Sequence, residues 1–135
     1  MQTFEIKQRL TGYNEHEKKR RRNRYAANAD KVRMENVIAW AIRAAKVKPV
    51  TAPQWIVYEW HEATRRRDKD NVRSRKKFIN DALQKTKVLP RDDNRYVAGF
   101  TDRFVYDKTD RVIVYLIDYN EENDNDEQGS PSGIS

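Results

Sequence analysis

The sequence contains no cysteine and only two histidines. Without thiols the chain can form neither disulfide bonds nor thiolate metal sites, so a bound metal must be held by carboxylates, histidine or carbonyl groups. Because histidines are scarce, carboxylates are the favoured ligands.

Long apolar runs are also missing, and no segment approaches the roughly 18 apolar residues of a membrane-spanning helix. The N-terminus lacks the apolar stretch of a secretory signal. We therefore expect a soluble, cytoplasmic protein with no membrane partner. The 135 residues, 37% of them apolar, can fill one core, which predicts one domain.

The C-terminal tail after Ile117 carries six acids and no Lys or Arg. Subtracting these from the 21 acids leaves 28 bases against 15 acids, a net charge of +13 over residues 1–117. Such a domain attracts polyanions, and phosphate backbones are the common case. A charged surface that only aids solubility is the alternative.

Hydrophobic periodicity predicts one α+β domain with a mixed or antiparallel sheet and two main helices. The predicted elements are a strand within 3–10, a helix through 34–45, a strand at 54–63, a helix at 70–85, and strands at 96–106 and 111–117. The strand at 54–63 is apolar on both faces and should be central. The last two strands should form a hairpin.

Domain boundaries follow from composition. The folded domain is predicted to cover residues 1–119, and residues 120–135 are acidic and then rich in Gly, Ser and Pro. Such a segment cannot bury enough apolar area to order itself. We predict a disordered tail there.

Asp68 and Asp70 lie two residues apart, at the junction of a predicted strand and helix. In extended backbone such side chains share a face and can approach one cation. Mg²⁺ takes one or a few carboxylates, keeps several waters and then meets phosphate oxygens. The alternative is that one of the two aspartates caps the helix.

The predicted second helix carries charge on one face. At ~100° per residue, Asp70, Lys77 and Asp81 fall within roughly 20° of one line, whereas Lys76 lies about 120° away. The apolar positions lie on the opposite side, as expected of a helix beneath a metal site. An exposed charged face with an ion pair between Lys77 and Asp81 is the alternative.

A third acidic group, Asp92 and Asp93, lies in the loop after this helix and before a strand. Loops at strand ends often hold functional carboxylates. Turn formation by aspartate explains the pair equally well.

Taken in order, D68-K-D70-N71, K77-F-I-N-D81-A82-L83 and D92-D93-N-R-Y-V97 resemble the signature of RusA-like Holliday junction resolvases. That signature is DxDN, a lysine four residues before DAL, and a DD pair about ten residues later. Tyr13-Asn14-Glu15 and Asn23-Arg24-Tyr25 resemble the family's N-terminal portion. The similarity extends from the first strand to about Ile117.

The resemblance implies a RusA-like fold and an endonuclease, of phage or prophage type, that cleaves Holliday junctions and other branched DNA in recombination and repair. It implies Mg²⁺ dependence, with Mn²⁺ as an alternative ion, a homodimer, and no nucleotide cofactor. By the same resemblance Asp68, Asp70 and Asp93 are the catalytic metal ligands, Lys77 is the catalytic lysine, and the surrounding residues are Asp81, Asp92 and Asn71.

Two positions depart from the family pattern. The family lysine comes four residues after the second aspartate, where this chain has Ser74, so either position could carry the lysine's role. Family members often have glycine where this chain has Lys87. A left-handed lysine costs ~1–2 kcal/mol, which predicts a different turn here.

Two basic segments are expected to contact phosphates beside the junction, which gives affinity but little sequence information. They comprise Lys18, Lys19, Arg20, Arg21, Arg22 and Arg24, then Arg65, Arg66 and Arg67. A solvated loop is the alternative for the first. The three tryptophans are expected in the core or a dimer interface.

Two other functions fit the same sequence. One is a non-catalytic basic DNA-binding protein whose acids only cap helices and cover the surface. The other is a nuclease that acts on flaps or forks.

Overall fold

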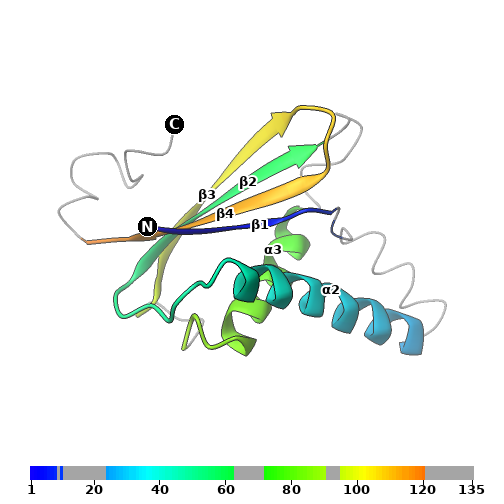
Figure 1. Ribbon diagram of the computed structural model, residues 1–135, viewed down its shortest axis with the longest axis horizontal. Coiled ribbons are helices and arrows are strands. Elements are labelled where there is room, and N and C mark those ends of the chain that lie inside the picture. Colours follow the sequence, from blue (N-terminus) through cyan, green and yellow to red (C-terminus); the bar gives the residue numbers. More distant parts are fainter. Residues whose placement is uncertain (9, 11–23, 63–71, 91–94, 121–135) are drawn as a thin grey trace.

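A four-stranded sheet with two helices on one face forms the structure (Figure 1). The computed structural model describes residues 1–8, 10, 24–62, 72–90 and 95–120. The strands are β1 (Gln2–Ile6), β2 (Gln54–Glu62), β3 (Val97–Tyr106) and β4 (Arg111–Asp118), and the helices are α2 (Arg24–Ala44) and α3 (Val72–Lys85). The predicted α+β class, mixed sheet and two helices are confirmed.

The sheet has the strand order β1-β4-β2-β3. Strand β4 runs antiparallel to both β1 and β2, whereas β2 and β3 are parallel and joined through α3. Strand β2 therefore has a neighbour on each side, as its apolar faces predicted.

The predicted hairpin between the last two strands is wrong. Although only residues 107–110 separate β3 from β4, β2 lies between them, and the connection passes over the end of β2. The amide of Asp107 donates to the carbonyl of Glu62 there, at 3.3 Å. Local turn chemistry cannot reveal this arrangement. Hydrogen bonding along both edges of the long, apolar β2 stabilises the sheet more than a hairpin between β3 and β4 would allow.

The core lies between the sheet and the helices. Ile56, Tyr58 and Trp60 alternate along β2 and are buried beneath the helices, in contact with the same cluster as Ile38 of α2 and Leu83 of α3. Among the described helices, none is long and apolar enough to span a membrane.

Both helices end in the same Schellman motif. Val88 N donates to Leu83 O at 2.9 Å and Lys87 N to Gln84 O at 2.9 Å, with Lys87 at φ 65°. At the end of α2, Lys46 occupies the equivalent position at φ 55°. The expectation of a different turn at Lys87 is wrong, because the two bonds to orphan helix carbonyls and the burial of Val88 outweigh the left-handed strain.

Candidate functional site

Most of the predicted site lies outside the described residues. The residues in question are Asp68, Asp70, Asn71, Asp92, Asp93, Lys18, Lys19, Arg20, Arg21, Arg22, Arg65, Arg66 and Arg67. Their roles stay predictions. Within the described part of the chain, no three histidine or acidic side chains come together in a way that could hold a metal ion.

A buried ion pair joins the two ends that flank residues 63–71. Arg75, in the first turn of α3, donates from Nη1 to Oε1 of Glu62, the last residue of β2, at 3.0 Å. Both side chains are less than 5% exposed, at 3% and 4%. The guanidinium also stacks on Trp60, 4.9 Å from its ring centroid. The start of α3 is thereby fixed against the end of β2.

The described residues that flank the Asp93 segment lie at the other end of the sheet. Gln54, the first residue of β2, donates its amide to the carbonyl of Tyr96 at 2.9 Å. At ~3.3 Å per residue, the two ends of this nine-residue strand lie about 26 Å apart. The described residues that flank the Asp68–Asp70 pair and those that flank Asp93 are therefore at opposite ends of β2.

Lys77 lies on the exposed face of α3, and Asp81 on the next turn is half-buried. Ile79 and Leu83 are fully buried on the other side, as the helical angles predicted. In this described part of α3, Lys77 and Asp81 form no ion pair with each other. The alternative of an i,i+4 pair is therefore not observed.

Lys76 has a separate environment from its neighbour. Its Nζ lies 2.9 Å from Oδ2 of Asp102 on β3 and 3.6 Å from the centroid of the Phe100 ring. Asp102 also accepts from Nε1 of Trp60 at 2.9 Å. Lys76 thus connects α3 to β3 and is not available for a site on the exposed face.

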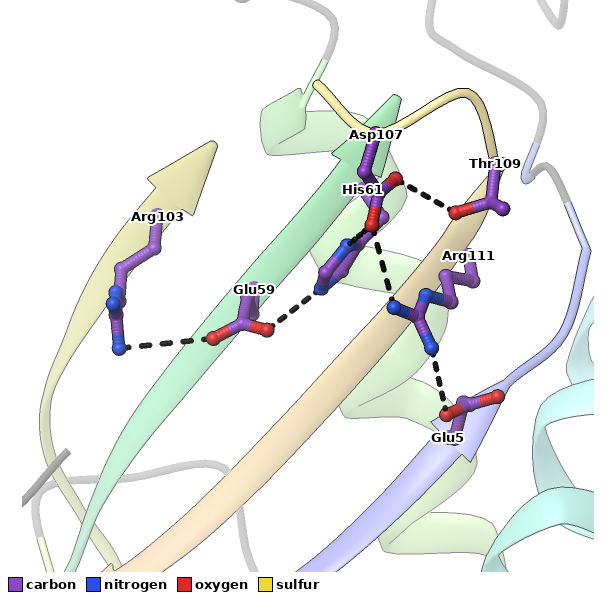
Figure 2. A network of polar contacts seen from close by, with 7 residues as sticks. All are labelled: Glu5, Glu59, His61, Arg103, Asp107, Thr109 and Arg111. Carbon is purple, nitrogen blue, oxygen red and sulfur yellow. Dashed lines mark hydrogen bonds and ion pairs between the residues drawn. The ribbon is translucent and has the colours of Figure 1, made fainter. Parts of the chain in front are cut away.

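A second group of charged side chains crosses the face of the sheet that the helices leave uncovered (Figure 2). Its members alternate in charge and come from all four strands and the connection between β3 and β4. They are Glu5, Arg111, Asp107, His61, Glu59 and Arg103, with Thr109 bonded to Asp107. We call this set the sheet-face network.

His61 is the centre of the sheet-face network. Its Nδ1 lies 2.6 Å from Oδ2 of Asp107, and its Nε2 lies 2.6 Å from Oε1 of Glu59. Ionised carboxylates only accept hydrogen bonds, so both ring nitrogens must donate when both acids are ionised. The two acids bind opposite edges of the ring and do not converge on one point, which suits a structural link and not a metal ion.

Two groups on this face have shifted pKa values. The hydroxyl of Thr109, then the ring of His61, hold the pKa of Asp107 well below its usual range, because both donate to the carboxylate. Burial, and next the charge of Glu59, raise the pKa of Tyr115. The first shift keeps the carboxylate of Asp107 charged, and the second keeps the hydroxyl of Tyr115 neutral.

Sequence reasoning missed the sheet-face network. A weak signal was present, because Glu59 and His61 are two residues apart on a strand and so share a face, and Asp107 and Arg111 flank a turn. Their meeting depends on the crossing of β2 by the β3–β4 connection, which the sequence did not reveal.

The chain was also compared with known proteins. No protein-family model matches it, and no curated protein sequence matches it.

Proposed function

We propose that the protein is a Mg²⁺-dependent endonuclease that cleaves Holliday junctions and other branched DNA as a homodimer. The observation that carries the proposal is the ordered set DxDN, Lys77 with DAL, and DD. The fold supports it, since the DxDN motif falls between a central strand and a helix whose exposed face presents Lys77.

The donor set suits the proposed ion. Asp68, Asp70 and Asp93 offer carboxylate oxygens, the hard ligands that Mg²⁺ prefers, and the chain has no cysteine to favour a softer metal. When bound, the ion supplies polarisation of the scissile phosphate and a more acidic water.

The chain's own residues would do the remaining work. Lys77 stabilises charge that develops on the phosphate, as a positioned cation does in phosphoryl transfer. The Glu62–Arg75 pair fixes both ends of the segment that holds two of the acids. The net charge of +13 over residues 1–117 attracts the DNA backbone.

The proposal is tested with a labelled four-way junction and a linear duplex, each with Mg²⁺ or EDTA. We expect Mg²⁺-dependent cleavage of the junction that is lost in Asp68→Asn, Asp70→Asn and Asp93→Asn, while junction binding survives. Asp124→Asn, which removes one acid from the tail, is the matched control and should cleave normally. Full cleavage by any two of the three site variants would reject the proposed site.

A further inference from the structure

The last two residues of β2, His61 and Glu62, are held on opposite faces of the sheet. Successive side chains of a strand point to opposite sides, so Glu62 faces the helices and His61 the uncovered face. Glu62 pairs with Arg75 of α3 at 3.0 Å. The ring of His61 lies between the carboxylates of Asp107 and Glu59, 2.6 Å from each (Figure 2). The two side chains are only 6% and 4% exposed, so this end of β2 is fixed from both sides.

The connection between β3 and β4 holds this end of β2 through two contacts. Oδ2 of Asp107 binds the ring of His61, and the backbone amide of Asp107 donates to the carbonyl of Glu62 at 3.3 Å. The carboxylate of Asp107 is itself oriented, because the hydroxyl of Thr109 donates to its Oδ1 at 2.7 Å and Nη2 of Arg111 to its Oδ2 at 3.3 Å. One acid thus links a side chain and a carbonyl of consecutive residues to the crossing connection.

Backbone pairing changes at the same point. Strand β4 pairs with β2 as far as His61, opposite Arg111, whereas β3 continues to Glu62, opposite Tyr106. Glu62 therefore has a strand neighbour on one side only, and strand ends with fewer backbone partners open more easily. The contacts of His61 and Asp107 lie where the support from β4 ends.

Buried charged groups fix an arrangement more than they stabilise it. Compared with apolar side chains of similar size they add little net stability, because desolvation offsets their attraction. Each ring nitrogen of His61 has one carboxylate partner, so only a ring in this orientation satisfies both acids. We therefore expect His61 to act on the geometry of this end of β2.

Geometry at this end matters to the proposed metal site. In the sequence Asp68 comes six residues after the end of β2, and Asp70 two residues before the start of α3. Mg²⁺ requires near-ideal octahedral geometry, and functional groups must be held within about 0.5 Å of their working positions. This inference rests on the proposed function: we propose that His61 is a positioning residue for these two acids, because it and Asp107 fix the end of β2 that precedes them in the chain.

Metal binding without DNA tests the inference apart from cleavage. Mn²⁺ is the probe, because carboxylates also suit this ion and the electron paramagnetic resonance signal of free Mn²⁺ falls as it binds. We expect His61→Gln to bind Mn²⁺ about 10–100-fold more weakly than wild type, the usual effect of losing a residue that orients metal ligands. A glutamine amide cannot donate from two opposite edges as the imidazole ring does. Asp107→Ala, which keeps the ring and the backbone amide, should weaken binding in the same way.

Two controls match these variants. Val57→Ala truncates a side chain that is 3% exposed on the same strand and face as His61, so it should lower stability without changing Mn²⁺ affinity. Glu5→Gln breaks the 3.5 Å ion pair with Arg111 at the β1 side of the network and should bind Mn²⁺ as wild type does. All proteins are compared at a temperature where their circular dichroism spectra show them folded. If His61→Gln does not fold, Asp107→Ala carries the comparison.

The Mg²⁺ dependence of junction cleavage gives a second readout. For His61→Gln, the Mg²⁺ concentration at half-maximal cleavage should rise by a similar factor. The rate at saturating Mg²⁺ should approach that of wild type, since every proposed ligand is still present. A purely structural role would instead lower the amount of active protein at all Mg²⁺ concentrations.

The outcomes separate this inference from the proposed function. Equal Mn²⁺ affinity in wild type and His61→Gln would overturn the positioning role and leave the nuclease untouched. A loss of affinity in Val57→Ala as large as in His61→Gln would overturn it too, because affinity would then follow stability alone. If wild type binds no Mn²⁺, or Asp68→Asn binds it as tightly as wild type, the proposed metal site is rejected and the positioning role with it.

Discussion

At the scale of residues, Lys76 and Lys77 are neighbours with different tasks. Lys77 is exposed on α3, whereas Lys76 is bound to Asp102 and stacked on Phe100. We predict that Lys77→Ala lowers junction cleavage by about 10²-fold, the effect of removing one cation from a transition state. Lys76→Ala should cleave normally per folded molecule but lose ~1–2 kcal/mol of stability.

Single-turnover cleavage and urea unfolding of both variants separate the two effects. Equal loss of cleavage in both, with equal stability, would contradict the assignment. Cleavage that is sensitive to Lys76 alone would show that the helical angles do not place Lys77 at the site.

Lys87 permits a prediction about stability alone. It adopts a left-handed conformation at φ 65°, which costs a residue with Cβ ~1–2 kcal/mol, whereas glycine adopts it freely. Part of that gain is offset by the greater freedom of glycine in the unfolded chain, so Lys87→Gly should stabilise by about 0.5–1 kcal/mol. The same change at Lys46 should act similarly, and Lys85→Gly, inside α3, should destabilise. Thermal unfolding decides, and a lower melting temperature for Lys87→Gly would contradict it.

At the scale of elements, the Glu62–Arg75 pair connects β2 to α3 in the interior. Removing one member of a buried ion pair typically costs about 3–5 kcal/mol, because a charge loses its partner inside the protein. We predict a loss of this size for Arg75→Met. Replacing both, in Glu62→Met with Arg75→Met, should recover much of it. Urea unfolding of the two proteins tests the coupling, and additive losses would contradict it.

The sheet-face network predicts how stability depends on pH. The pKa of Asp107 is lowered in the folded state by Thr109 and His61, so its contribution is present above the unfolded value of about 3.8 and is lost as pH falls below it. We expect Asp107→Asn to be less stable than wild type at neutral pH, with a difference that begins to shrink as pH falls below about 3.8 and vanishes only below the lowered pKa of Asp107. Unfolding measured from pH 7 down into the strongly acid range, below pH 3, tests this, with Asp118→Asn as the control. A difference that stays constant over that range would contradict the role of Asp107.

The elements also show how far the sequence predicts the fold. The helices and the central place of β2 were predictable, because periodicity and an apolar strand on both faces depend on local composition. The pairing of β3 with β2 was not, since it depends on which strand competes best for the edge of β2. Of the predicted site, the exposed position of Lys77 followed from helical angles. The Glu62–Arg75 pair and the sheet-face network join residues that are far apart in the sequence, so no periodic pattern in the sequence indicates them.

At the scale of the whole molecule, the described residues that flank the two acidic segments lie at opposite ends of β2, about 26 Å apart. The proposed homodimer has a two-fold axis, and a two-fold axis can bring one end of β2 in one chain beside the opposite end of β2 in its partner. We therefore predict that a site using Asp68, Asp70 and Asp93 draws Asp93 from the other chain.

Mixing inactive variants tests this directly. When Asp68→Asn and Asp93→Asn proteins exchange subunits, each mixed dimer should contain one site with all three acids intact. Its other site should lack both Asp68 and Asp93 and be inactive. Half of the dimers are mixed, so about a quarter of the wild-type number of sites should return, as nicks in one strand of a labelled junction. Asp68→Asn mixed with Asp70→Asn is the control and should stay inactive, because those acids come from the same segment. If the first mixture is equally inactive while wild type cleaves, each chain holds its own complete site, and residues 63–71 and 91–94 must meet across the length of β2.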